Sequence, residues 1–97
     1  ADYPVSDYDL VVLEASEIPY ALLFSPDCKL RFLKAVKLVV DRLSIGGIKF
    51  ERGVYTTAEI NEKVGFTVAV NSLAASDANC GSIEVLKNPR GFSIIVR

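Results

Sequence analysis

The sequence predicts a single α+β domain in which a mainly antiparallel sheet of about six strands packs against one long amphipathic helix. Two observations favour this class. Short β-branched runs separated by turn residues recur along the chain, and one longer segment carries apolar residues at helical spacing. The chain of 97 residues, 51% of them hydrophobic, is long enough to build one core. No internal repeat or linker divides it, so residues 1–97 are expected to form one compact domain.

The first two strands are expected at Asp9–Ala15 and Tyr20–Phe24. The first is a short run rich in apolar and β-branched residues. The second is apolar on both faces, which is typical of a central strand. Because only the short connection Ser16–Pro19 separates them, we expect the two strands to pair as a hairpin.

The long helix is predicted to begin at Ser25-Pro-Asp27 and to end before Gly46-Gly47. Serine is a good N-cap, proline fits the first turn, and an acid suits the positive end of the helix dipole. A glycine can take the positive φ of a C-cap. One face of this helix gathers the apolar residues Cys28, Phe32, Leu33, Ala35, Val36, Val39, Val40 and Leu43.

The second half of the chain predicts further strands. Ile48–Arg52 alternates apolar and charged residues, and Val64–Val70 alternates apolar with small or polar ones. Between them, Thr56 and Glu59 have the spacing of a capping box. This spacing favours a short second helix over Thr57–Val64, with a polar loop as the alternative.

The last segment predicts an exposed loop followed by a hairpin. Residues 74–81 are small and turn-forming. Ser82–Lys87 and Phe92–Val96 are strand-like, and Asn88-Pro-Arg-Gly91 between them is a turn sequence. The predicted order is therefore β-β-α-β-β-β-β, with the short second helix as an optional addition.

Cys28 and Cys80 are the only two cysteines, and we predict that they form a disulfide. Cys28 would face the buried side of the long helix, and Cys80 precedes a strand. The bond would then join the start of the helix to the end of the sheet, contributing about 4 kcal/mol in the chain-entropy model. A disulfide favours a secreted protein, whereas two buried free thiols would indicate a cytoplasmic one.

A strand followed by Ser-Pro-Asp-Cys28 and a helix resembles the site of thioredoxin-like oxidoreductases. The resemblance covers residues 20–43 and implies a redox role for Cys28, at the start of a helix. The sequence departs from that family in two ways. Leu30 and Arg31 stand where a second motif cysteine would be, and no proline lies between Pro26 and Pro89.

The chain contains no histidine, which removes the commonest proton-transfer group near neutral pH and most zinc chemistry. The strand and helix order is loosely similar to that of small secreted microbial ribonucleases, which need a histidine acid. No nucleotide-binding glycine motif is present. We therefore expect no enzyme, no metal and no cofactor.

Secretion is expected, with a cytoplasmic location as the alternative. Methionine is absent and residue 1 is Ala, which indicates a processed N-terminus, left by removal of a signal peptide or of an initiator methionine, or else a boundary chosen within a longer chain. The longest apolar run, Ile18–Phe24, is far shorter than the roughly 20 residues of a membrane-spanning helix. We therefore predict no membrane span.

The predicted function is that of a small secreted, non-enzymatic binding protein, similar to effectors, toxins or inhibitors, that acts through its surface on a protein partner. The net charge is −1, but residues 1–24 hold five acids and no base. An intracellular module that binds a protein or a nucleic acid through the basic helix is the alternative. A thiol redox protein using Cys28 is a lesser one. The candidate binding surface is the outer side of the helix, formed by Leu30, Arg31, Lys34, Lys37, Leu38 and Arg42.

Overall fold

The computed structural model describes residues 2–71 and 81–89. The strands and the helix found there are β1 (Asp2–Val5), β2 (Leu10–Val12), β3 (Ser16–Phe24), β4 (Leu30–Phe32), β5 (Lys37–Ile45), β6 (Ile48–Lys49), β7 (Gly53–Thr56), α1 (Thr57–Val64), β8 (Ala69–Asn71) and β9 (Ser82–Val85).

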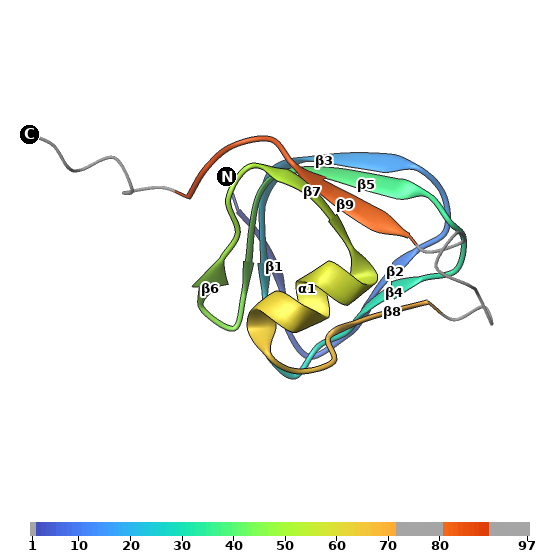
Figure 1. The fold of residues 1–97 in the computed structure, drawn as a ribbon, viewed down its shortest axis with the longest axis horizontal. Helices are drawn as coiled ribbons and strands as arrows, with labels where there is room; N and C mark the ends of the chain where they lie inside the picture. Colours follow the sequence, from blue (N-terminus) through green and yellow to red (C-terminus); the bar gives the residue numbers. More distant parts are fainter. Residues whose placement is uncertain (1, 72–80, 90–97) are drawn as a thin grey trace, which may run out of the picture.

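These strands form two sheets (Figure 1). The larger has the order β1-β3-β5-β9-β7, with β6 paired to β5, and the smaller has the order β2-β4-β8. The neighbours β1, β3, β5 and β9 run parallel, whereas β6 and β7 are antiparallel to their partners. The prediction of a small α+β domain with about six strands in its sheet is confirmed. The expected mainly antiparallel pairing is wrong, because the larger sheet is mixed.

The parallel pairing arises because the chain winds between the two sheets. It passes from β1 to β2, returns to β3, crosses again to β4 and returns to β5. Each of the first three strands therefore pairs with the strand two elements later: Asp2 lies opposite Ala21, and Leu10 lies opposite Leu30. Successive turns of the chain stack on one another, as in solenoid folds.

The long helix predicted after Ser25 is not formed, and its residues belong to β4 and β5. Burial in β4 alternates, with Leu30 and Phe32 inside and Arg31 between them. Leu38 and Val40 are likewise buried on either side of the half-buried Val39. These positions satisfy a period of two as well as the helical period, and β-branched valines favour the strand.

Both proposed ends of that helix are turns. The Ser25 hydroxyl accepts from the Asp27 backbone N–H at 3.4 Å, and the Ser25 carbonyl accepts from the Cys28 N–H at 3.1 Å. Gly46 and Gly47, with φ of 57° and 85°, form the tight connection between β5 and β6. A type I′ hairpin turn needs positive φ at both of its central residues, and a helix C-cap commonly uses a glycine with positive φ as well.

The short second helix is confirmed as α1. The Thr56 hydroxyl accepts from the Glu59 backbone N–H at 3.2 Å, and the Glu59 carboxylate accepts from the Thr56 N–H at 2.9 Å, so the capping box is complete. Gly65 ends the helix with φ of 84°. Local side-chain chemistry thus defines this helix at both ends.

The remaining predictions are confirmed only in part. The expected first hairpin is wrong, since β2 and β3 belong to different sheets. The strand predicted at Ile48–Arg52 is limited to β6, and that at Val64–Val70 begins only at β8. The strand after Gly81 is present as β9. The predicted loop up to residue 80 lies outside the described residues, and so does the returning strand Phe92–Val96.

The core lies between the two sheets and under α1. Its largest fully buried side chains include Phe32, Phe50, Leu22 and Ile60. Phe50 also packs edge-on against Tyr55, with ring centres 5.0 Å apart. Across the described part of the chain, no helix has the length and apolar character to cross a membrane.

Candidate functional site

The binding surface predicted on a helix is divided by the strands. Leu30 is 0% exposed and Leu38 is 2% exposed, so both belong to the core and neither contributes to a surface. Their assignment as exposed residues is wrong because a strand turns its side chains with a period of two. The four cations of that surface remain solvent-accessible to differing extents, but they no longer share one face.

Arg31 and Lys37 are engaged in ion pairs. Arg31 Nε donates to Asp9 Oδ2 at 2.9 Å, and Lys37 Nζ lies 2.8 Å from Glu84 Oε1. Arg42 is half-buried and donates to the Asn88 carbonyl, whereas Lys34 is exposed in the turn between β4 and β5. A continuous basic stripe of the kind that follows a phosphate backbone is therefore not formed by these residues.

Cys28 is buried, with 3% of its surface exposed, and it bears no disulfide in the structure. It lies in the turn before β4, so the helix start that favours a thiolate is absent there. This removes the structural basis of the resemblance to thioredoxin-like proteins. Cys80 lies outside the described residues, and the Cys28–Cys80 disulfide stays a prediction.

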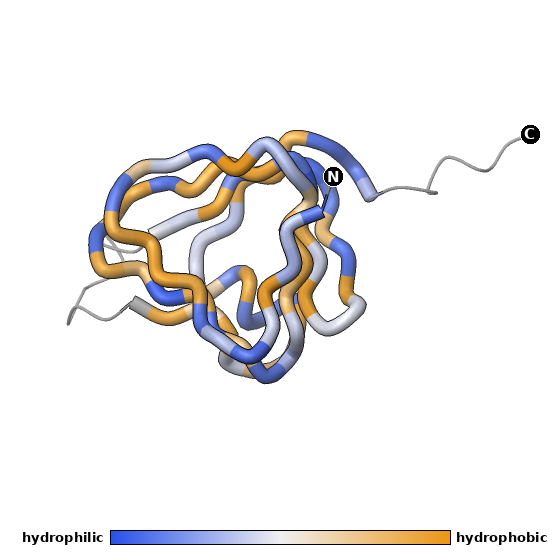
Figure 2. Tube along the Cα trace, turned by 180° about the vertical axis from the view of Figure 1, so that it is seen from behind, coloured by the Kyte–Doolittle hydropathy of each residue, from blue (hydrophilic) through white to orange (hydrophobic). Residues whose placement is uncertain are grey.

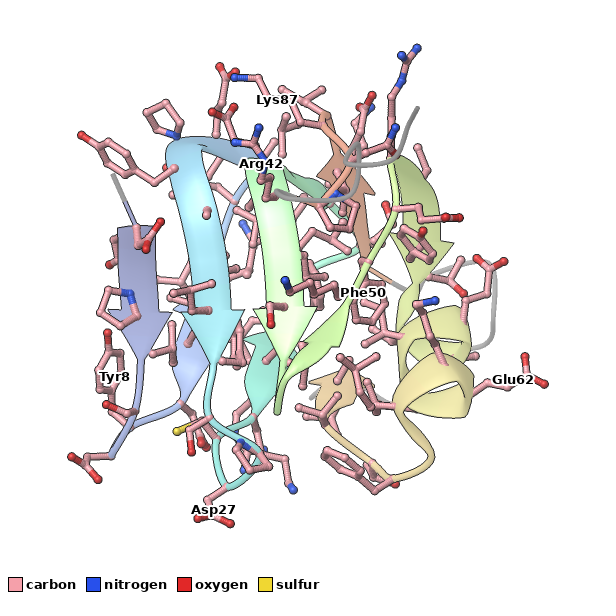
Figure 3. All side chains as sticks on the ribbon, turned by 90° about the vertical axis from the view of Figure 1, so that its left-hand side faces the viewer. Tyr8, Asp27, Arg42, Phe50, Glu62 and Lys87 are labelled. Atoms are coloured by element: carbon pink, nitrogen blue, oxygen red, sulfur yellow. The ribbon has the colours of Figure 1, made fainter. Side chains whose placement is uncertain are left out.

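The strands of the two sheets follow one another from β1 and β2 at one end to β7 and β8 at the other. These two ends of the molecule differ in what covers them. Helix α1 packs against β7 and β8, which are the last strands of the two sheets, and buries Thr57, Ile60 and Val64. Figure 3 shows the stack from the side, with β1 and Tyr8 at one end and α1 and Glu62 at the other. The helix therefore caps one end of the core.

The opposite end is formed by β1 and β2, each of which pairs on one side only within the described residues. Figure 2 shows the molecule from this side. Large apolar and aromatic side chains are exposed on β1, on β2, on residues next to them and on β3, from 37% for Tyr3 to 57% for Leu13. We call this surface the end face and define it by Tyr3, Tyr8, Val11, Leu13 and Tyr20.

A hollow of about 340 Å³ opens beside the end face. Ser16 and Ile18 line it and pair with β5, whereas β1 pairs with Ala21–Phe24 of β3. The hollow thus exposes the space between the two sheets. Its lining, which we call the end-face hollow, consists of Leu10, Val11, Val12, Leu13, Glu14, Ser16, Ile18 and Leu38.

The charge around this hollow is negative. Glu14 lines it and Glu17 is exposed on the adjacent strand β3, whereas no Lys or Arg is among its described lining residues. The turn between β2 and β3 is fixed by the Ser16 hydroxyl, which donates to the Glu14 carbonyl at 3.0 Å. The site is therefore an apolar hollow with an acidic rim.

Asp9 at the same end has a structural role. Its carboxylate accepts from the Lys29 backbone N–H and from Arg31 Nε, both at 2.9 Å, which ties the first turn of the chain to the second. The backbone hydrogen bond from Lys29, followed by the bond from Arg31, holds the pKa of Asp9 below its usual value. The Asp9 carboxylate therefore already has hydrogen-bond donors within the fold.

A second, smaller hollow of about 160 Å³ lies where β1, β3, β5 and β6 meet. Its lining includes Asp2, Arg42, Ser44 and Lys49, so acid and base face it together. In the described part of the chain no group of three or more metal-ligating side chains gathers.

No known protein family, curated protein or solved structure matches this chain.

The end face was not indicated by the sequence pattern. Val11 and Leu13 alternate with Leu10 and Val12, and a run that is apolar on both faces is normally buried on both. Here Val12 is buried, whereas Val11 and Leu13 are 45% and 57% exposed. The sequence offers one other indication of this site: the apolar run lies within residues 1–24, whose charged residues are all acidic.

Proposed function

We propose that this protein is a non-enzymatic binding protein that holds a protein partner at its end face. One observation carries the proposal: α1 covers one end of the core, whereas the other end presents exposed apolar side chains beside an open hollow. An exposed apolar patch that borders a hollow is typical of an interaction site.

The composition of the end face supports a protein partner. Tyr3, Tyr8 and Tyr20 combine a large apolar ring with a polar hydroxyl, and tyrosine is enriched in protein interfaces. The acidic rim would repel a phosphate backbone. A nucleic-acid partner is therefore the weaker alternative, and the basic helix once expected to bind it is replaced by strands.

The lack of histidine in the sequence supports a non-enzymatic role. Secretion and an effector-, toxin- or inhibitor-like activity stay part of the proposal on the composition of the sequence. Neither secretion nor such an activity changes which surface we propose to bind the partner.

The test is a selection of random phage-displayed peptides against the immobilised protein, followed by binding to variants. Peptides selected on the wild type should lose binding to Val11→Ser/Leu13→Ser. They should keep it on Val54→Ser, which removes a 55% exposed valine from β7, away from the end face. Selected peptides that bind both variants like the wild type would contradict the proposal.

A further inference from the structure

We infer that the hollow of about 160 Å³ on the larger sheet binds a small aliphatic monocarboxylate, with the carboxylate between Arg42 and Lys49 and the carbon chain over Ala21 and Leu23. We call this hollow the sheet-face hollow. It shares no residue with the end face or the end-face hollow, so the inference is independent of the proposed function. It follows from the strand register, the bonding of the two cations and the size of the hollow.

Strand register brings the lining residues together on one face of the larger sheet. Ala21 in β3 lies opposite Arg42 in β5. In the next row, Leu23 lies opposite Ser44, and Ser44 lies opposite Lys49 in β6. Residues two apart on a strand share a face, so the two rows are adjacent on the same side of the sheet. The hollow therefore lies over strands that are paired with one another and does not depend on an open strand edge.

The floor of the sheet-face hollow is apolar. Leu22 and Phe24, which alternate with Ala21 and Leu23, belong to the core between the two sheets. Ala21 and Leu23 thus face the other side of the larger sheet, where the short side chain of Ala21 leaves room beside the 37% exposed Leu23. An aliphatic chain placed there would remove apolar surface from water.

Arg42 is held in position while most of its donors stay available. It is half-buried on β5 (Figure 3), and its Nε donates to the Asn88 carbonyl at 3.1 Å. This bond uses one of five guanidinium N–H groups. Within the described ranges, neither Arg42 nor Lys49 forms an ion pair. A guanidinium binds a carboxylate through two parallel hydrogen bonds, and a neighbouring ammonium group adds attraction, so a carboxylate matches this pair of cations.

The size and charge of the sheet-face hollow restrict the ligand further. A cavity of about 150 Å³ holds a benzene ring, so this hollow has room for a carboxylate with about four more carbon atoms. Asp2 lines the hollow from β1, on the other side of β3 from Arg42. A second negative charge at the far end of a ligand would meet the Asp2 carboxylate. The hollow therefore favours a monocarboxylate over a dicarboxylate.

The experiment is an NMR titration of the labelled protein with four small molecules: pentanoate, the neutral pentanamide, acetate and pentanedioate. Pentanoate should shift the amide signals of Ala21, Leu23 and Ser44. Its dissociation constant at low salt should be at least about tenfold lower than that of pentanamide, which lacks the charge, and that of acetate, which lacks the chain. Pentanedioate, which carries a second carboxylate, should also bind more weakly than pentanoate.

Charge variants locate the bound carboxylate. Arg42→Gln should raise the dissociation constant of pentanoate at least about tenfold, and Lys49→Gln should raise it about threefold, because an exposed ammonium is screened by water and salt. Lys34→Gln is the control, since it removes an exposed cation from the turn between β4 and β5, and it should leave binding unchanged. The end-face variant Val11→Ser/Leu13→Ser should leave binding unchanged as well.

Four outcomes would overturn the inference. They are binding that Arg42→Gln leaves unchanged, equal binding of pentanoate and pentanamide, equal binding of pentanoate and pentanedioate, and shifts confined to the end face or absent at about 50 mM pentanoate. Should Arg42→Gln fail to fold, Lys49→Gln decides instead, because its side chain is exposed and its removal leaves the core intact. Unchanged binding by Lys49→Gln would then overturn the inference.

Discussion

Gly81 lies against the ring of Phe32 so closely that a Cβ at residue 81 would overlap ring atoms. Phe32 is a core residue of β4, and Gly81 immediately precedes β9. The contact therefore joins the core of the smaller sheet to the entry of a strand in the larger one. It favours a residue without a side chain, since Phe32 is enclosed by the core and moving it aside would disturb the packing.

Gly81→Ala should destabilise the protein by about 1–3 kcal/mol, because overpacking forces the ring or the backbone to shift. Chemical denaturation measures this loss. Phe32→Ala lowers stability by itself, but it removes the ring atoms that the added methyl group would overlap. The double variant should therefore be more stable than the sum of the two single effects predicts. Strict additivity would show that the two residues do not share this space.

Asn61→Ala should cost about 2–4 kcal/mol of unfolding free energy, because buried hydrogen-bond donors lose their acceptor. The Asn61 side-chain oxygen accepts from the backbone N–H groups of Val68 and Ala69, and its nitrogen donates to the Ala69 carbonyl, each at 2.8 Å. These bonds attach α1 to β8. The exposed neighbour Glu62→Ala is the control and should change stability little. Equal effects would show that the bonds contribute nothing.

Asp9 should make the protein less stable in acid. Its pKa is lowered in the folded state, so its contribution is fully present above the unfolded value of about 3.9 and is lost as pH falls through the folded pKa. The stability difference between wild type and Asp9→Asn should therefore be present near neutral pH and shrink on acidification. Denaturation midpoints across this range measure it. A difference that stays constant from neutral pH into acid would show that ionisation of the Asp9 carboxyl group contributes nothing to stability.

Leu38→Ala should lower the unfolding free energy by about 2–5 kcal/mol, as for other buried leucines. Leu13→Ala should change it by about 0.5 kcal/mol or less, because Leu13 is largely exposed. Thermal or chemical unfolding distinguishes the two. The reverse order would mean that Leu38 is on the surface, as a helix over this segment required.

The predicted Cys28–Cys80 disulfide is tested by mass. The purified protein, unfolded and alkylated without reductant, should gain no alkyl group if the bond exists. Addition of two groups would contradict the disulfide and favour the reduced state. Because Cys28 is 3% exposed, unfolding is needed for the reagent to reach it.

The parts of the fold that the sequence predicted correctly are those controlled by neighbours in the chain. Thr56 and Glu59 define α1 by contacts within one turn. The sequence correctly indicated positive φ at Gly46 and Gly47. A hairpin turn and a helix end both use that conformation, so the glycines alone did not decide between the two. The choice between them was made by β3 and β9, which lie beside β5 and are distant in sequence.

The same limit applies to the candidate site. Val36, Val39 and Val40 fit a helical face, and their β-branched side chains fit a strand as well. Only the partners of Val40, which are Ile18 and Val85, decide between the two. The end face depends on which strands are last in each sheet. That order follows from tertiary pairing, so no local pattern indicates that Val11 and Leu13 stay exposed.

The central position of β5 has a consequence for synthesis on the ribosome. Val40 pairs with Val85 in β9, and β9 in turn holds β7, which leads directly into α1. A nascent chain that stops short of Ser82 can wind its first turns but has no strand to which β7 can attach. Closing such distant contacts slows folding. We therefore expect the finished domain to form only after residues 82–85 have left the exit tunnel, with the helical cap among the last parts to settle.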